Sequence, residues 1–176
     1  MRDRIVGALV LLAVVQVGLL AMAFTSAGDG AVAWFRKGDS LAGIELRDRD
    51  GVRRSLATGR PTLVLVFHSE CGHCARVAPD WRDWLERHES GVSVVALSSE
   101  SPEEANRYSS DHGWGVDAWT VAGIGLGSRA HAITARTPWL FAVDGDGVVI
   151  DAAHGWDIER IGGLVASGHS GAADAR

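Results

Sequence analysis

An apolar run at residues 62–67, of sequence TLVLVF, constrains the fold of this chain more than any other segment. The run lacks the apolar–polar alternation of a strand with one face in water, so it predicts a central strand covered on both faces. A length of 176 residues is enough for one domain with additional segments. Because the flanking segments can supply covering layers, we expect an α/β domain.

The segments around this run alternate between strand and helix patterns. The expected order is a hairpin at 44–56, the central strand, a helix at 74–88, a strand at 92–97, a helix opened by Ser101 and Pro102, a hairpin at 139–152 and a helix at 158–166. Asp-Gly turns mark both hairpins. This order predicts a mixed sheet with helices packed on it.

The N-terminal residues are typical of a segment directed to a membrane. Arg2 and Arg4 precede an uncharged run at residues 5–24, and roughly 20 helical residues span the hydrocarbon core of a bilayer. The length favours an uncleaved signal anchor, and cleavage at Ala21-Met22-Ala23 is the alternative, which would give a secreted form. The positive-inside rule predicts a single-pass cell-membrane protein with its domain on the extracytoplasmic side, periplasmic or outer.

Composition divides the chain into four parts. These are an anchor at 1–27, a linker at 28–40, a folded domain at 41–166 and a Gly/Ala-rich tail at 167–176 that we expect to be loose. The formal net charge is −5, from 17 Lys and Arg against 22 Asp and Glu. This balance argues against nucleic acid as a partner, because binding to phosphates needs clustered positive charge.

The residues that carry chemistry are two cysteines, Cys71 and Cys74, which follow the central strand and open the next helix. The free N–H groups and the dipole of a helix N-terminus both stabilise a thiolate. We expect Cys71 at the exposed mouth and Cys74 one turn inward, which suits an attacking thiolate and a resolving thiol. His73 should lower the thiol pKa, whereas Glu70 should raise it. A structural disulfide or a metal site is the alternative, but a bridge across two residues adds little stability.

The segment VFHSECGHCARVAP, residues 66–79, resembles the active-site segment of the thioredoxin superfamily. Pro79 matches the proline of the family's active-site helix, and Thr137-Pro138 resembles its cis-proline loop. The stretch His154-Gly155-Trp156 and the long separation of the two motifs are similar to the membrane-anchored, redoxin-type TlpA/ResA-like branch. The resemblance covers about residues 41–166 and implies a thioredoxin-like fold.

This resemblance implies an extracytoplasmic thiol–disulfide oxidoreductase that reduces or exchanges disulfides of proteins or peptides. Cys71 would be the nucleophile and Cys74 the resolving thiol, while Thr137 and Pro138 would shape the substrate groove. No cofactor is implied, because the cysteine pair itself carries two electrons. The resemblance also implies a membrane electron donor or acceptor as a partner.

The direction of electron flow stays open at the level of sequence. Relatives of the TlpA/ResA type are typically reductants, for example of the haem-site cysteines of apocytochrome c. The CGHC pair favours the opposite direction, because stabilising the reduced thiolate makes a pair more oxidising.

Two positions depart from the family's pattern. Leu65 stands where many thioredoxins carry a buried carboxylate, and Glu70 replaces the usual aromatic residue before the first cysteine. No obvious buried base therefore assists deprotonation of Cys74, which leaves water, His68 and His73 as candidates.

Two other functions of the same fold follow from different residues. A peroxiredoxin-type peroxidase is disfavoured, because its PxxxTxxC pattern would need proline at Val64 and threonine at His68. A copper-binding chaperone is the alternative function, with Cys71, Cys74 and His154 as a Cys₂His ligand set.

Overall fold

The computed structural model describes residues 34–88, 91–121 and 128–173, with side chains up to Ser167. Within these ranges no helix combines the length and the apolar character that crossing a bilayer requires. The predicted membrane helix at residues 5–24 lies outside the described residues.

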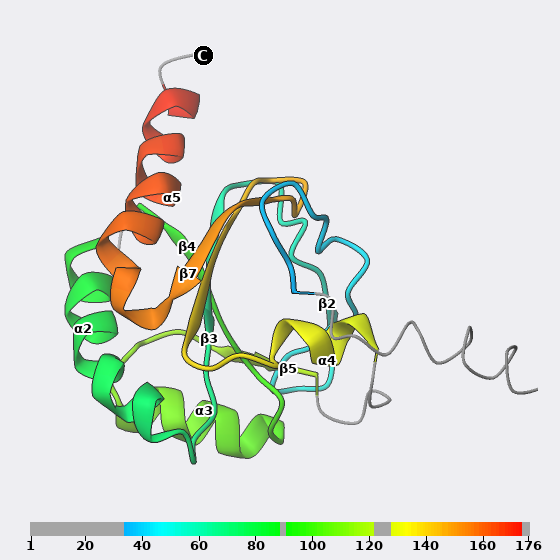
Figure 1. Ribbon diagram of the computed structural model, residues 1–176, viewed down its shortest axis with the longest axis vertical. Helices are drawn as coiled ribbons and strands as arrows, with labels where there is room; N and C mark the ends of the chain where they lie inside the picture. The colour runs from blue at the N-terminus through cyan, green and yellow to red at the C-terminus, as the bar shows by residue number, and fades with distance from the viewer. Residues whose placement is uncertain (1–33, 89–90, 122–127, 174–176) are drawn as a thin grey trace, which may run out of the picture. The chain divides into compact units, whose positions relative to one another are not determined.

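The described residues form a seven-stranded sheet in the order β2-β1-β5-β4-β3-β6-β7 (Figure 1). The strands are β1 (Leu46–Arg47), β2 (Arg53–Arg54), β3 (Thr62–Val66), β4 (Ser93–Ser98), β5 (Ala118–Thr120), β6 (Trp139–Val143) and β7 (Val149–His154). The helices are α2 (Gly72–His88), α3 (Pro102–Asp111), α4 (Arg129–Ile133) and α5 (Ile158–Ala173), with a 3₁₀ turn, η2 (Gly155–Asp157), before α5. The predicted α/β architecture with a mixed sheet is confirmed.

Strand β3 lies inside the sheet, as its uninterrupted apolar sequence predicted. All five of its residues are buried. It pairs in parallel with β4 and antiparallel with β6, so both of its edges are bonded. The carboxyl ends of β3 and β4 therefore meet at one edge of the sheet, and the cysteine pair follows β3 at that edge.

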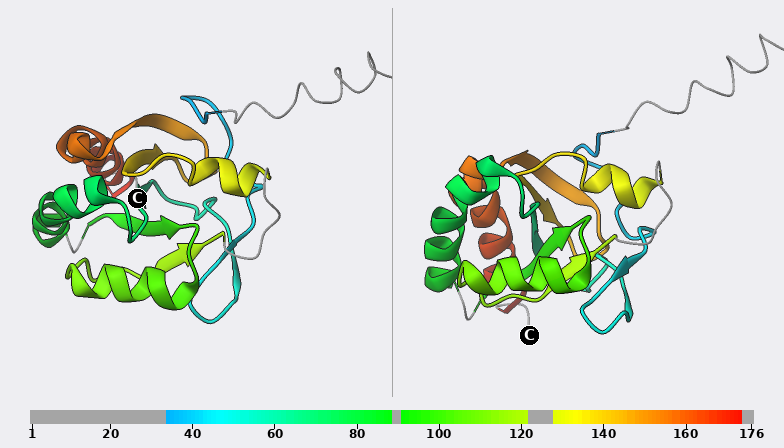
Figure 2. Two further views of the ribbon diagram at one scale, coloured as in Figure 1. Left: turned by 60° about the horizontal axis from the view of Figure 1, so that its bottom comes forward. Right: turned by 90° about the horizontal axis from the view of Figure 1, so that it is seen from below.

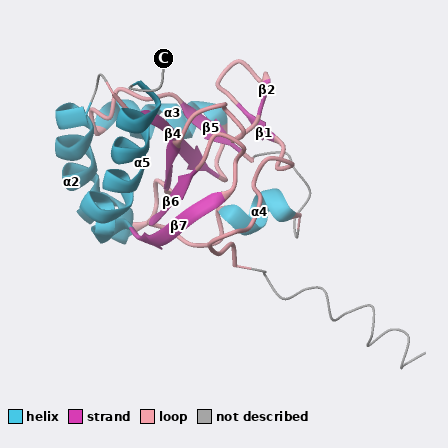
Figure 3. Cartoon of the chain, turned by 90° about the horizontal axis from the view of Figure 1, so that it is seen from above, coloured by secondary structure: helices cyan, strands magenta, loops and turns pink. Residues whose placement is uncertain are grey.

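Helices cover both faces of the sheet (Figures 2 and 3). One face carries α2, α3 and α5, and its core includes Phe67, Trp81, Trp84 and Trp114. The other face is covered by α4 and by chain segments before β3, whose buried side chains are mainly aliphatic. Cys74 belongs to the first, aromatic core, so the candidate site is built on that face.

Helix α2 begins at Gly72, two residues before the position expected from the apolar stripe. The stripe residues Val77, Trp81, Trp84 and Leu85 are buried, as their helical spacing predicted. The helix packs against α5, where the ring of Trp84 occupies the space that a side chain at Gly162 would need. This contact fixes α2, and with it the position of Cys74.

Helix α3 begins as the sequence predicted, at Pro102 after the N-cap Ser101. The Ser101 side chain accepts a bond from the Glu104 N–H, and the Glu104 carboxylate accepts one from the Ser101 N–H. This reciprocal arrangement satisfies two donors that a helix N-terminus otherwise leaves free. Strand β5 and helix α4 were not predicted, because segments of three and five residues are too short to show a period.

The two boundaries of the predicted domain require correction. The expected linker at 28–40 ends too late, because residues at its C-terminal end bond to the sheet edge. Gly38 donates to the Val149 carbonyl at 2.8 Å, and Val149 donates to the Asp39 carbonyl at 2.9 Å. Ser40 also forms an antiparallel bridge with Val148. Extended backbone beside β7 gains these bonds whatever its side chains are, so composition could not reveal it.

The predicted loose tail at 167–176 is instead helical as far as Ala173, because α5 continues past its expected end at residue 166. The Ser167 hydroxyl donates to the Gly163 carbonyl at 2.9 Å, so it is bonded along the helix. The residues past 166 are mainly small and polar and carry no apolar stripe, which is why the stripe ended before the helix did.

Candidate redox site

The two cysteines lie where the chain leaves β3 and enters α2. Cys71 immediately precedes the helix and is partly exposed, whereas Cys74 lies in its first turn and is fully buried. Both are free thiols. The predicted contrast in exposure between the two positions is confirmed.

The Cys71 sulfur is held between the helix and the loop before β6. Its Sγ accepts a bond from the backbone N–H of Cys74 at 3.3 Å, and the thiol donates to the Thr137 carbonyl at 3.6 Å. The Thr137–Pro138 peptide bond is cis, as the likeness of this dipeptide to a cis-proline loop implied. The structure thus brings together Cys71, Cys74, Thr137 and Pro138.

Several hydrogen bonds tune the Cys71 thiol. Partial burial by itself would raise its pKa, but bonds with the side chains of Cys74 and Thr137 and with the backbone of Cys74 and His73 outweigh this effect. The net result is a pKa below the ordinary thiol value of 9.0. Because the thiolate is the nucleophile, this shift favours attack by Cys71 near neutral pH.

The opposite shift applies to Cys74. The pKa of its thiol is raised to about 12. Burial is the main cause, and the hydrogen bond with the Cys71 side chain adds to it. Interaction with the His68 backbone opposes the shift but does not cancel it. Cys74 therefore stays protonated while Cys71 ionises, which matches a resolving thiol that reacts second.

The loop that carries Pro138 is supported from beneath by Gly155. The Gly155 N–H donates to the Pro138 carbonyl at 3.2 Å, and the Trp81 indole N–H donates to the Gly155 carbonyl at 2.8 Å. A Cβ added at Gly155 would lie 2.8 Å from Pro138 Cβ and 3.0 Å from the Trp81 ring. Only glycine fits this position, so the HGW stretch supports the loop next to Cys71.

His73 and Glu70 are both exposed at the mouth of the site. The contribution of His73 to the lowered pKa of Cys71 comes from its backbone. The expected effects of the His73 imidazole and of the Glu70 carboxylate on the Cys71 thiol stay predictions.

His154 lies apart from the cysteine pair in its interactions. Its ring contacts Trp139 edge-on and stacks with Trp156, each with centroids 6.4 Å apart, and its Nδ1 accepts a bond from the Trp156 N–H. Among the residues that the structure describes, no group of three or more His, Cys, Asp or Glu side chains could hold a metal ion. The Cys₂His set suggested for copper is therefore not assembled.

A buried carboxylate beside the site was missed in the sequence. Glu100 follows β4, and its side chain is only 8% exposed. It accepts bonds from the Ser69 N–H at 2.8 Å, from the Ser69 hydroxyl and from the Ser98 hydroxyl at 2.9 Å. The His68 Nδ1 lies 3.7 Å from its Oε1. Glu100 thereby anchors the loop that precedes Cys71, and an acidic residue directly after a buried parallel strand was the available signal.

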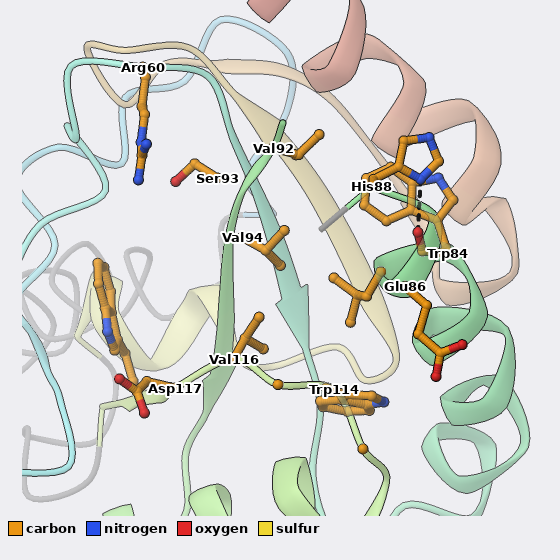
Figure 4. Close-up of a pocket in the computed structure, with 14 residues that line it drawn as sticks. Arg60, Trp84, Glu86, His88, Val92, Ser93, Val94, Trp114, Val116 and Asp117 are labelled. Atoms are coloured by element: carbon orange, nitrogen blue, oxygen red, sulfur yellow. Dashed lines mark hydrogen bonds between the residues drawn. The ribbon is translucent and has the colours of Figure 1, made fainter. Parts of the chain in front are cut away.

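Figure 4 shows a cavity beside the C-terminal part of α2. It has a volume of about 480 Å³ and is lined by Trp84, His88, Val94 and Trp114, among others. The His88 ring stacks on Trp84 and its Nδ1 bonds the Trp84 carbonyl. The lining includes the C-terminal part of α2, whereas the cysteines lie at the N-terminal end, and none of the predicted site residues lines it.

Several solved structures share this architecture. The thioredoxin domain of a thiol-disulfide oxidoreductase from Bacteroides vulgatus is 16% identical, with a TM-score of 0.60 over 73% of this chain and 97% of that one. A domain of a possible thiol-disulfide isomerase from Cytophaga hutchinsonii is 21% identical, with a TM-score of 0.58 over 75% and 94%. The peroxidoxin BcpB from Mycobacterium tuberculosis is 16% identical, with a TM-score of 0.57 over 78% and 97%. No protein-family model and no curated protein matches the chain.

These likenesses show that the chain has the thioredoxin fold, which confirms the predicted fold. Because both a disulfide oxidoreductase and a peroxidoxin share the architecture, the fold alone does not choose between their reactions. That choice depends on the residues of the site.

Proposed function

We propose that this chain is an extracytoplasmic thiol–disulfide oxidoreductase that acts on disulfides or thiols of proteins or peptides. One observation carries the proposal: two free thiols three positions apart have opposite pKa shifts, and the more acidic one is partly exposed. The residues at the two other positions of the peroxiredoxin pattern are Val64 and His68, which does not favour a peroxidase. The predicted helix at residues 5–24 would tether the domain to the membrane.

The chemistry balances without a further cofactor. The Cys71 thiolate attacks one sulfur of a substrate disulfide, the substrate S–S bond breaks, and the first substrate thiolate leaves. Cys74 then loses its proton and attacks the Cys71 sulfur of the mixed disulfide, which releases the second substrate thiolate. The pair ends as a disulfide, and the substrate has gained two electrons.

The substrate groove would lie along Thr137 and Pro138. Pro138 has no backbone N–H, so it does not compete for the sulfur atoms. An extended substrate chain could pair with the backbone of Thr137, as peptides pair with sheet edges in other proteins. The indole of Trp156, which is 52% exposed on the neighbouring turn η2, offers apolar surface to residues that flank the substrate cysteine.

The Cys74→Ser variant tests this function. It should keep the attack by Cys71 but lose the resolving thiol, so a mixed disulfide with the substrate should accumulate. Non-reducing electrophoresis and mass spectrometry of the full chain, expressed in its own membrane compartment, would show the adduct and identify the partner. The Cys71→Ser/Cys74→Ser double variant is the control and should trap nothing. Absence of any adduct on Cys74→Ser, with Cys71 free and reduced, would contradict the proposal.

The direction of electron flow can be read from the reduction potential of the cysteine pair. A value near about −270 mV, as in thioredoxin, would mark a reductant and agree with a role in cytochrome c maturation. A value near about −180 mV, as in protein disulfide isomerase, would mark an oxidant or isomerase. Equilibration with glutathione buffers of defined ratio measures this potential.

A further inference from the structure

Tyr108 is a buried polar residue to which the two-step disulfide exchange described above assigns no role. It lies on α3, is 9% exposed and belongs to the same core cluster as Cys74. Its hydroxyl oxygen is buried and makes no hydrogen bond with any described residue. A buried hydroxyl without a partner lowers stability, because it has given up its bonds to water.

The Tyr108 ring is held in place by aromatic neighbours. It stacks on Phe67 with centroids 5.1 Å apart and on His112 at 4.1 Å, and it contacts the edge of Trp114 at 5.6 Å. Phe67 directly follows β3, in the segment that leads to the cysteines. The ring position is therefore fixed by packing, while the hydroxyl hydrogen is free to rotate.

Besides His112, which stacks on the ring, the titratable groups that act on this hydroxyl are those of the redox site. After burial, the strongest influence on its pKa is the charge of Cys74, followed by Cys71 and Glu100, and together they raise the pKa of Tyr108 to about 12. The hydroxyl thus remains a neutral O–H donor throughout the range in which the cysteines react. It lies within electrostatic range of both sulfur atoms and of the buried carboxylate.

We propose that the free O–H of Tyr108 stabilises the negative charge that forms on the Cys74 sulfur when this thiol resolves the mixed disulfide. This inference rests on the proposed function. The resolving step must create a thiolate in a fully buried position, where an unpaired charge is costly. On this face of β3, Leu65 offers no polar group to Cys74. The Tyr108 hydroxyl, on α3, is a polar group in the same core.

A single-atom substitution separates this role from packing. Tyr108→Phe removes the hydroxyl and keeps the ring that stacks on Phe67. Thr120→Val is the matched control, because Thr120 Oγ1 is the other buried side-chain oxygen without a bond in the described residues. Both variants should unfold at a temperature equal to or above that of the original chain, since each removes an unsatisfied polar atom.

The experiment follows the two steps of exchange separately. Reduced full-length chain is mixed with oxidised glutathione, quenched with acid and analysed by intact mass, which resolves the glutathione adduct from the final disulfide. In Tyr108→Phe, we expect the adduct to form at the original rate but to resolve about tenfold more slowly, because the O–H dipole that would stabilise the Cys74 thiolate is lost. Raising the pH should restore the resolving rate. In Thr120→Val both rates should be unchanged.

The outcomes distinguish the two proposals. If the original chain forms no adduct and no disulfide, the oxidoreductase proposal fails. If the adduct forms and Tyr108→Phe resolves it as fast as the original chain does, only the role of Tyr108 is refuted. If Tyr108→Phe slows both steps equally or unfolds earlier than Thr120→Val, the residue is structural and the inference is likewise overturned.

Discussion

Cys71 and Cys74 occupy two neighbouring regions of the molecule with opposite physical character. The mouth of the site, at Cys71, is partly exposed, and the Cys71 sulfur accepts a hydrogen bond from α2 and donates one to the Thr137 carbonyl. The interior, at Cys74, is sealed within the aromatic core formed by α2, α3 and α5. The pKa of the Cys71 thiol is lowered and that of the Cys74 thiol is raised to about 12, although the two side chains are identical.

The comparison shows that the helix start alone does not account for the opposite pKa shifts of the two thiols. Both thiols belong to the same helix start, so the helix dipole acts on both. Their pKa values differ because of tertiary contacts. The Thr137 loop bonds with Cys71 and helps to lower its pKa, whereas burial is the main cause of the raised pKa of Cys74. Experiments that expose the interior or displace the loop should therefore change the two thiols differently.

The largest expected effect is the difference in reactivity between the two thiols. In the reduced chain at pH 7.5, iodoacetamide should modify Cys71 more than about a hundredfold faster than Cys74, as peptide mapping would show. The Cys71 rate should rise with pH and level off below pH 9.0, because its thiolate is complete above the lowered pKa. Equal modification of both cysteines would remove the contrast on which the proposed function depends.

A smaller effect is expected from loosening the interior. Gly162→Ala would place a Cβ 2.3 Å from the buried Trp84 ring, so it should lower the free energy of unfolding by about 1–3 kcal/mol. Gly163→Ala is the matched control, because nothing lies within 4 Å of the added atom, and it should be neutral or stabilising by up to about 1 kcal/mol. Urea unfolding measures both. If Gly162→Ala is as stable as Gly163→Ala, the contact between α2 and α5 is not tight.

The smallest effect is expected at the mouth of the site. Gly155→Ala should push Pro138 and the Thr137 carbonyl away from Cys71, because the added Cβ meets the proline ring. We expect disulfide exchange to slow by about tenfold at most, while Cys74 remains as unreactive as before. The rate with oxidised glutathione and the mapping of alkylated cysteines give the two readouts. Faster alkylation of Cys74 would show that mouth and interior are not separable.

The elements with a long apolar pattern could be predicted from the sequence. Residues 62–67 gave a central strand, the stripe in α2 gave its buried face, and Ser101 with Pro102 gave the start of α3. Short elements such as β5 and α4 escaped, because too few residues define their period. The helical continuation to Ala173 escaped because it carries no apolar stripe.

The candidate site was predictable only in part for a related reason. Cys71 and Cys74 carry their signal in their own spacing, whereas Glu100 and Tyr108 come from segments that the parallel pairing of β3 and β4 brings beside them. No local spacing marks such residues. The roles proposed for Cys71, Cys74 and Tyr108 in disulfide exchange stay predictions for the experiments described above.

By itself, the sequence determined a sheet with a buried central strand and a cysteine pair at the start of the following helix, because these depend on hydrophobic period and short spacing. Tertiary structure decided how the two thiol pKa values move apart, which carboxylate anchors the loop before Cys71 and which unpaired hydroxyl shares the core with Cys74. These properties depend on burial and on contacts between distant segments, and solvent exclusion exists only once the chain has folded.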